Sequence, residues 1–424
     1  MFSAARWFTR FMFVTSIEEM SVSKKTRILL IVLINATMFL FGFLENIKGV
    51  SYPLIKTEFG VSHDEQGRMV SLLSFSYTFF CIAAGYILSR FGLKKVYLMG
   101  FIFALLGLSL VFFAPGFWIS AACLFLVFSC FGLFEIGVNG LASILFTKKA
   151  ALSLNLLHFM YGVGAVLGPR AAGMICGIEG LSWRHVYLFS VPLVLLFFIP
   201  AAAATYPEPE RENSLPGTGP ENGSVRRGGS GFSAALRTPL VWFFGIVLGL
   251  MMSVEMATSN WGSLYFQDVY GMDPTTAGAG FVSGFFVLFT LSRLVSGFVI
   301  EKIGYIKSLT GAVVIIGTIF LAGFALGRMG IYVLPVLGFF IAILWPTLMA
   351  AAMGVFGAGA PVMCSAVIAI GGLFNALMQL ATGYVNRYVG DAWGYRSCLI
   401  FVAALLALLL KFGGKLKKPE AMNR

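Results

Sequence analysis

Residues 85–92 read GYILSRFG, and residues 297–304 read GFVIEKIG. Both stretches begin and end with glycine, follow a long apolar run, and carry a basic residue two positions before the last glycine. The second stretch comes about half a chain length after the first, in a chain of 424 residues. A repeat on this scale indicates that the chain consists of two related halves.

Other features recur at nearly the same spacing. Glu45 lies in the first apolar run, and Glu255 lies in the seventh. The segment FGVSHDEQGR at 59–68 has a counterpart in YGMDPTTAGAG at 270–280. Between the two halves, residues 206–237 are polar and rich in Pro, Gly and Ser. That composition cannot build a core and is typical of a linker.

The composition places most of the chain in lipid. Hydrophobic residues make up 58% of the chain and charged residues 11%, and the mean hydropathy is +0.89. Soluble domains carry about 25% charged residues, so a soluble protein of this composition is excluded. A helix needs about 20 apolar residues to cross a bilayer. The runs are continuously apolar, which favours helices over the alternating pattern of barrel strands. We expect twelve transmembrane helices, at residues 27–55, 67–89, 95–115, 117–145, 150–177, 184–205, 238–268, 276–300, 306–327, 330–356, 361–388 and 394–414.

The expected fold is an all-α membrane protein with twelve transmembrane helices in two pseudo-symmetric six-helix halves. Met20 stands directly before a short basic lead into the first helix, and we expect residues 1–19 to be dispensable. The expected parts are a cytoplasmic N-terminal segment (1–26), an N-terminal six-helix bundle (27–205), a cytoplasmic linker (206–237), a C-terminal six-helix bundle (238–414) and a cytoplasmic tail (415–424).

The positive charge of the chain is distributed unevenly. The net charge is +12, and most of the 30 Lys and Arg residues fall in the N-terminus, in loops after even-numbered helices and in the C-terminus. The positive-inside rule then places both termini and the linker on the cytoplasmic side of a cell membrane, inner or plasma. Topology thus explains the basicity, and we expect no nucleic-acid partner.

The chain shows no pattern of catalytic or metal-binding residues. The six Cys lie in apolar segments without CxxC spacing, and the three His form no metal-ligand cluster. A catalytic triad, a phosphate-binding loop and a paired-acid motif are likewise missing from the sequence. We therefore expect that the protein is not an enzyme and uses no cofactor or metal.

The chain resembles the major facilitator superfamily of transporters over nearly its full length. That superfamily carries a signature between its second and third helices: Gly, three residues, Asp, Arg, one residue, Gly and then basic residues. The resemblance implies two parallel six-helix repeats that rock about a central site. Here the signature stands as Gly85, Ser89, Arg90, Gly92, Lys94 and Lys95, with Ser in place of the Asp, and Glu301, Lys302 and Gly304 stand at the equivalent place in the second half.

More narrowly, the chain is similar to the fucose–galactose–proton symporter family in three stretches. LFEIGVNGLASIL (133–145), LNLLHFMYGVGAVLGP (154–169) and LWPTLMAAAMG (344–354) are similar to that family's fourth, fifth and tenth helices. The resemblance implies that helices 1, 4, 7 and 10 line a central cavity. It also implies an essential acid in helix 1 just before a proline, but counting back from Pro53 puts Gly49 at that position.

The stretch FGFLENIKG (41–49) places Glu45, Asn46 and Lys48 inside an apolar run. An ionisable group at the bilayer centre costs roughly 2.5–3.5 kcal/mol, and it is tolerated where it faces a shared, partly hydrated cavity. Glu45 and Lys48 are three residues apart and share a helix face. They form either a static ion pair or part of a coupling site, in which Lys48 pairs with Glu45 or with Glu135.

We expect two sets of functional residues in the membrane. The proton-coupling acids are Glu135, Glu45 and Glu255, because an acid in the membrane interior marks a proton or substrate path by default. The substrate-binding set combines amides, an imidazole, a phenol and indoles, which match sugar hydroxyls and the apolar face of a pyranose. It comprises Lys48, Asn46, Asn139, Asn155, His158, Tyr161, Asn260, Trp261, Trp345, Asn375 and Gln379.

Structural roles compete with these functional ones. The amides equally fit contacts between helices, and His158 and Trp345 equally fit packing. Arg293 lies close to the cytoplasmic end of the eighth helix, and we expect it to reach the membrane surface or to pair structurally.

The leading hypothesis is a secondary active transporter that moves a small polar solute, a sugar, by proton-coupled symport with alternating access. The alternative is a proton-driven exporter of amphipathic compounds or drugs, with a larger and more apolar cavity, which the 43 Phe of the chain make conceivable. In either case we expect a monomer in membrane lipid, with a small-molecule substrate and the proton as coupling ion.

The charge asymmetry predicts the side on which the linker lies. A cysteine introduced by Gly217→Cys should remain unlabelled when an impermeant thiol reagent is added outside intact cells, because the linker should be cytoplasmic. The same cysteine should react after the membrane is permeabilised. Efficient labelling in intact cells would reverse the predicted orientation.

Overall fold

The computed structural model describes residues 23–146, 150–207, 234–357 and 360–413. Throughout these residues the regular structure is helical. The first group of helices comprises α2 (Lys24–Asn46), α3 (Lys48–Phe59), α4 (His63–Phe91), α5 (Leu93–Phe113), α6 (Phe117–Leu145), α7 (Ala150–Cys176) and α8 (Trp183–Ala203). The second comprises α10 (Pro239–Tyr270), η1 (Pro274–Gly278), α11 (Ala279–Ile303), α12 (Tyr305–Ala325), η2 (Gly327–Met329), α13 (Gly330–Val333), η3 (Leu334–Val336), α14 (Leu337–Ile341), α15 (Leu344–Phe356), α16 (Ala360–Val389), α17 (Trp393–Arg396) and α18 (Cys398–Gly413).

The described residues contain twelve helical segments that are long and apolar enough to cross a membrane. α2 and α3 together make the first span, and the short elements between Gly327 and Phe356 together make the tenth. Six spans precede residue 208 and six follow residue 233. The prediction of an all-α membrane protein with twelve transmembrane helices is therefore confirmed.

The observed helices differ most from the predicted spans where polar residues at a span's end are helical. α4 begins at His63, whereas the hydropathy pattern predicted a start at 67. The Ser62 backbone N–H donates to Glu65 Oε2 at 2.9 Å, and the Ser62 hydroxyl bonds the same oxygen at 2.9 Å. This capping box supplies partners for the exposed first turn of α4, so a polar segment becomes helical.

The repeat visible in the sequence reappears in the backbone. Gly92 ends the first octapeptide at φ +81°, and Gly304 ends the second at φ +87°. Gly60 follows α3 at φ +60°, and Gly271 follows α10 at φ +62°. These positive φ values disfavour residues with a Cβ, so both halves need glycine at matching turns.

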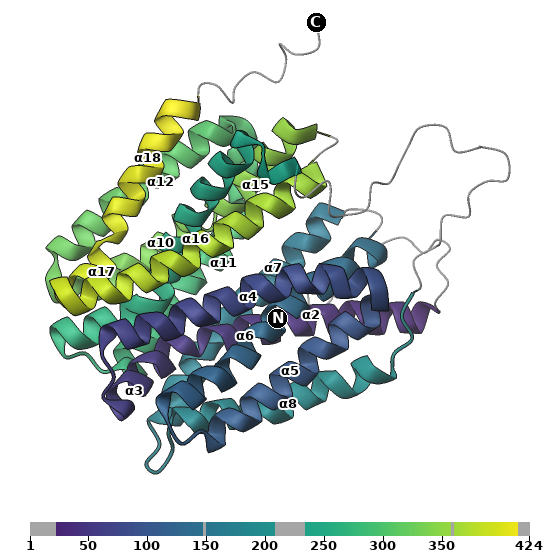
Figure 1. The fold of residues 1–424 in the computed structure, drawn as a ribbon, viewed down its shortest axis with the longest axis horizontal. Helices are drawn as coiled ribbons and strands as arrows, with labels where there is room; N and C mark the ends of the chain where they lie inside the picture. Colours follow the sequence, from purple (N-terminus) through teal and green to yellow (C-terminus); the bar gives the residue numbers. More distant parts are fainter. Residues whose placement is uncertain (1–22, 147–149, 208–233, 358–359, 414–424) are drawn as a thin grey trace, which may run out of the picture.

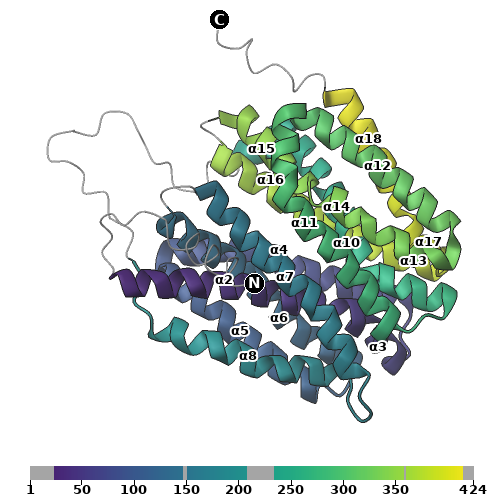
Figure 2. The ribbon, with the colours of Figure 1, turned by 180° about the vertical axis from the view of Figure 1, so that it is seen from behind.

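The spans form two groups that lie side by side. Figure 1 shows α2 to α8 in purple to teal on one side and α10 to α18 in green to yellow on the other, and Figure 2 shows the same division from behind. The groups contact each other through α4 with α16, α7 with α11, and α3 with α10. A Cβ added to Gly383 of α16 would lie 2.6 Å from the Gly67 Cα of α4. The two glycines thus allow the backbones of the two halves to approach closely.

A polar cluster also joins the halves, at the end of the bundle where α3 ends and α4 begins. Lys56 Nζ lies 3.2 Å from Asp268 Oδ1, and His63 Nε2 lies 3.0 Å from Asp391 Oδ1 and 3.5 Å from Asp268 Oδ2. Lys56 and His63 belong to the first half, whereas the two aspartates belong to the second. α8 ends and α10 begins at the opposite end of the bundle (Figure 1). The halves are therefore held together at the end away from the linker.

The close approach of α4 and α16 predicts a steric effect. Gly383→Ala should lower the thermal unfolding temperature of the detergent-purified protein, because its Cβ has no room and overpacking costs about 1–3 kcal/mol. Gly354→Ala in α15 is the matched control, since a Cβ there has no atom within 4 Å. Equal unfolding temperatures for the two variants would contradict the glycine contact.

Candidate functional site

Glu45 is the last residue but one of α2 and Lys48 is the first of α3, on either side of a break in the first span at Ile47. Pro53 follows the break by about a turn and a half. Because proline has no N–H, it cannot bond the Gly49 carbonyl as a helix interior requires. The first span therefore changes from one helix to another at the depth where its charged residues lie.

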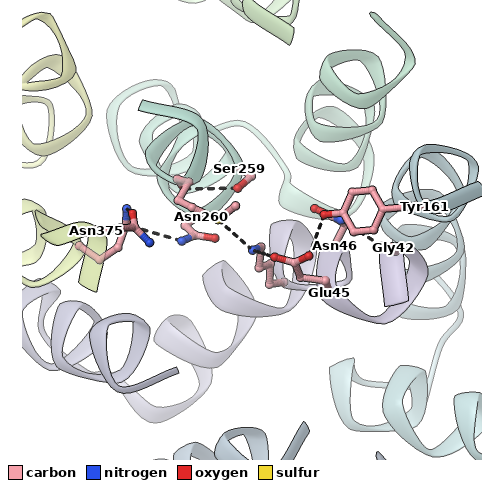
Figure 3. A network of polar contacts seen from close by, with 10 residues as sticks. Gly42, Glu45, Asn46, Tyr161, Ser259, Asn260 and Asn375 are labelled. Carbon is pink, nitrogen blue, oxygen red and sulfur yellow. Dashed lines mark hydrogen bonds and ion pairs between the residues drawn. The ribbon is translucent and has the colours of Figure 1, made fainter. Parts of the chain in front are cut away.

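The Glu45 carboxylate has two partners in Figure 3. Lys48 Nζ lies 3.1 Å from Glu45 Oε1, and the Tyr161 hydroxyl donates to Oε2 at 2.7 Å. The Lys48 side chain is 3% exposed and the Glu45 side chain 12%. Of the two partners considered for Lys48, the structure thus selects Glu45; the described ion pairs include none between Lys48 and Glu135.

The other neighbours of Lys48 come from both halves. Its Nζ lies 3.7 Å from Met256 Sδ on α10 and 5.7 Å from the centroid of the Phe128 ring on α6. The ring adds a cation–π attraction to the ion pair. Enclosed in this way, Lys48 does not extend to the membrane surface, and the ion pair lies where the two halves meet.

The missing acid at Gly49 has a steric cause. A Cβ at Gly49 would lie 2.7 Å from Val282 Cγ2 on α11. The packing of α11 against this position leaves no room for a carboxylate side chain. Glu45, one turn earlier, is the acid of the first span that the structure places between the halves.

An amide network occupies the second half. Gln379 Oε1 on α16 accepts hydrogen bonds from Asn260 Nδ2 at 3.3 Å and from Trp261 Nε1 at 2.9 Å. Gln379 Nε2 donates to Asn375 Oδ1 at 3.2 Å. All four residues are buried, and the buried Asn260 Oδ1 has no hydrogen-bond partner among the described residues. The network therefore retains an unused acceptor at the α10–α16 contact.

Glu135 and Asn139 form a second polar pair on α6. Asn139 Nδ2 donates to Glu135 Oε1 at 2.9 Å, and both residues are partly exposed. Glu135 forms no ion pair with the described residues, whereas Glu45 is held by a lysine. Glu135 therefore has a hydrogen-bond donor but no fixed counter-charge.

The structure corrects the expectation for Arg293. α11 continues to Ile303, so Arg293 lies roughly three turns before the end of the helix. Its Nε is buried without a hydrogen-bond partner, and its guanidinium lies 4.7 Å from the centroid of the Phe289 ring. Arg293 is partly exposed, but it lies well inside α11 rather than at the end of the helix. It lies within electrostatic range of the site residues Glu255, Glu135, Tyr161 and His158.

Other expected residues take a smaller part in this constellation. Asn46 lies beside Tyr161 in Figure 3, but its Nδ2 donates to Gly42 O of its own helix, and its buried Oδ1 has no partner among the described residues. Trp345 is partly buried against the hydrophobic core at the start of α15. Asn155 lies on α7, but its side chain is outside the described part of the structure.

The described residues contain no group of three or more His, Cys, Asp or Glu side chains arranged to hold a metal ion. The polar groups placed above offer hydrogen bonds and charges between the halves.

A model of the Major Facilitator Superfamily matches residues 34–368. The chain belongs to the major facilitator superfamily. Its members are transporters, and this one is a multi-pass membrane protein.

One relative of this major facilitator protein is an uncharacterized MFS-type transporter of Yersinia pestis. It is 22% identical over 260 residues, which span 61% of this chain and 63% of that protein. The chain thus spans less than two thirds of the length of this relative.

Solved structures of the superfamily share the fold. The fucose:proton symporter FucP of E. coli has 18% identity and a TM-score of 0.63, covering 93% of this chain and 100% of FucP. The nucleoside transporter NupG has 14% identity and a TM-score of 0.69, covering 93% of this chain and 99% of NupG. A bacterial homolog of the human lysosomal transporter Spinster has 14% identity and a TM-score of 0.71, covering 93% of this chain and 98% of that protein. The resemblance to the superfamily, and in fold to the fucose symporter, is confirmed.

Three residues of the major facilitator site escaped prediction from the sequence. Met256 and Phe128 are apolar residues in apolar helices, and no local pattern distinguishes them from packing residues. Arg293 did carry a signal, because an arginine within an apolar span is rare unless it faces the protein interior. The sequence did not fix where this helix ends, so it did not show how far Arg293 lies from the helix end.

The buried ion pair predicts a rescue. Lys48→Met should lower thermal stability markedly, because it leaves the Glu45 carboxylate uncompensated; breaking a buried pair costs about 3–5 kcal/mol. Lys48→Met combined with Glu45→Gln should recover most of that loss, since the double variant buries no unpaired charge. The measurement is the unfolding temperature of both proteins in detergent.

The combination of Lys48→Met with Glu135→Gln is the matched control, and it should not recover stability. Wild-type stability of Lys48→Met alone would show that the ion pair contributes nothing. Rescue by Glu135→Gln in place of Glu45→Gln would transfer the pairing to Glu135.

Proposed function

We propose that this protein is a secondary active transporter that moves a small polar solute, a sugar, by proton-coupled symport with alternating access. The observation that carries the proposal is the setting of Glu135. This acid is partly exposed in a membrane-spanning helix, accepts a hydrogen bond from Asn139, and has no ion-pair partner among the described residues. An acid without a fixed counter-charge is suited to take up and release a proton during transport.

Proton coupling is assigned first to Glu135. Glu45 is already bound by Lys48 and Tyr161, which supports a role as a strut between helices. Glu255 lies within electrostatic range of Arg293 but forms no ion pair with the described residues, so it is the second candidate for a titrating group. Coupling of proton and solute transport then requires that protonation of the acid and binding of the solute favour the same conformational change.

Solute binding is assigned to the amide network and its neighbours. Amides present a donor and an acceptor side by side, as a sugar hydroxyl does. The unpartnered Asn260 Oδ1 supports this assignment, since a buried acceptor without a hydrogen bond is costly and a ligand hydroxyl would satisfy it. Trp261 is committed through its Nε1 to Gln379, so its ring orientation is fixed.

Alternating access is assigned to motion of the bundle 27–205 against the bundle 238–414. The Gly67–Gly383 contact and the Lys56–Asp268 ion pair close one end of the bundle in this structure. We place the linker and both termini in the cytoplasm, and the protein in the cell membrane. The closed end is then the outer end, and opening it requires these contacts to break.

Export of amphipathic compounds is the second candidate function. Buried aromatic rings pack behind Tyr161, since the Phe41 ring centroid lies 5.3 Å from that of Tyr161 and 4.9 Å from that of Phe131. Aromatic side chains near a site suit apolar ligands as well as sugars. Binding of amphipathic dyes with no response to any polar solute would favour export.

Glu135→Gln should uncouple transport from the proton. The amide keeps the shape and hydrogen bonding of a protonated acid but cannot titrate. Solute exchange across vesicles without a gradient should therefore persist, whereas uphill accumulation driven by a pH gradient should disappear. The measurement compares counterflow with gradient-driven uptake in the same vesicles.

The control variant is Glu179→Gln, in the exposed turn between α7 and α8, which should keep both activities. Unchanged uphill uptake by Glu135→Gln would remove Glu135 from coupling and leave Glu45 and Glu255. Uptake that ignores a pH gradient in the wild-type protein as well would refute proton coupling itself.

A further inference from the structure

Arg293 differs from other shielded basic residues of the protein. Lys48, Lys56 and Arg184 each lie within ion-pair distance of a carboxylate, on Glu45, Asp268 and Glu58 respectively. Arg293 has no such partner among the described residues, and its Nε is buried without a hydrogen bond. A guanidinium carries five donors in a rigid fork. Its contact with the Phe289 ring satisfies none of these donors with an oxygen.

The charges around Arg293 leave it without a committed partner. Three acids, Glu45, Glu135 and Glu255, and two cations, Lys48 and Arg293, lie between the halves. The Glu45 carboxylate and Lys48 satisfy each other. Arg293 then faces Glu135 and Glu255, both within electrostatic range but neither within ion-pair distance. When these acids bind protons, Arg293 is left as an uncompensated charge, which is costly in the membrane interior.

We propose that Arg293 binds a carboxylate of the solute, and that the solute is therefore a sugar acid rather than a neutral sugar. This inference rests on the proposed function, because it refines the class of solute at the same site. The fork of a guanidinium matches the two oxygens of a carboxylate. The hydroxyls of the same molecule suit the amides of the site, and His158 lies within electrostatic range of the arginine.

A single negative charge fits the site better than two. One guanidinium balances one carboxylate once Glu135 and Glu255 are neutral. A phosphate dianion would add a charge that no described cation is free to balance, since Lys48 is held by Glu45. The arrangement also links the anion to the coupling proton, because protonation of the two acids removes the carboxylates that compete for Arg293.

The experiment is a thermal-shift titration of the purified full-length protein with matched solutes. The panel pairs glucuronate with glucose and galacturonate with galactose, and adds gluconate and glucose 6-phosphate. A ligand that binds the folded state raises the unfolding temperature by mass action. We expect a rise with one or more of the three sugar acids, and none with the paired neutral sugar or with the phosphate.

The variants Arg293→Gln and Arg293→Lys assign that rise to the arginine. Arg293→Gln should abolish it, and Arg293→Lys, which keeps the charge but loses the fork, should weaken apparent affinity by about tenfold or more. Arg293→Lys keeps the test decisive if Arg293→Gln does not fold. The matched control is Arg170→Gln, an exposed arginine of α7, which should bind the acids like the wild type.

The outcomes separate this inference from the proposed function. Stabilisation by neutral sugars alone overturns the inference and leaves sugar transport standing. Stabilisation by glucose 6-phosphate alone would mean that the site binds a phosphate and not a carboxylate, which overturns the inference. Binding of sugar acids that is unchanged in both Arg293 variants moves the carboxylate to another residue and also overturns the inference. No response to any member of the panel overturns the sugar acid together with the sugar.

Discussion

A charged side chain in the membrane interior must be paired, hydrated or bound to a ligand. Leaving it in hydrocarbon costs roughly 2.5–3.5 kcal/mol even on the mildest scales. This constraint governs the space between the two halves of the protein. Glu45 and Lys48 meet it by pairing at 3.1 Å, with the Tyr161 hydroxyl on the remaining oxygen. The pair lies where α2, α3, α6, α7 and α10 meet, so the electrostatics of one short segment depend on the packing of five helices.

The other ionisable groups of the site meet the same constraint differently. Glu135 has an amide donor and partial exposure in place of a cation, and Arg293 has an aromatic ring and distant acids in place of an ion pair. Ionisable groups that lack an ion-pair partner are suited to exchanging one interaction for another. The Glu45–Lys48 pair is instead suited to holding a helix break in place. The site thus combines a fixed pair with groups that remain available to a proton and a ligand.

The contacts between the halves are of kinds that can form and break. Gly67 and Gly383 allow a close backbone approach without interlocked side chains. The Lys56, His63, Asp268 and Asp391 cluster is polar and lies at the end of the bundle, where water can replace its partners. The large apolar side chains of both halves belong to one core cluster. The glycine and polar contacts between the halves suit rigid-body motion of one half against the other, as in other members of the superfamily.

The sequence by itself determined the class, the number of spans and the repeat, because hydropathy over about 20 residues and recurring glycines are local properties of the chain. The sequence also identified Glu45, Lys48, Glu135 and Gln379 as candidate site residues, since polar residues are exceptions within apolar runs. Only the tertiary structure decided which of them are partners. Lys48 had two candidate acids, and the choice depended on the helix break at Ile47 and on the position of α7, which brings Tyr161 to Glu45. Gly49 lacks an acid because Val282, more than 200 residues away in the chain, fills the space. Distances between residues on different helices arise from packing, which no local pattern encodes. For that reason the surroundings of Arg293, with the Phe289 ring and the distant acids, became visible only in the assembled fold.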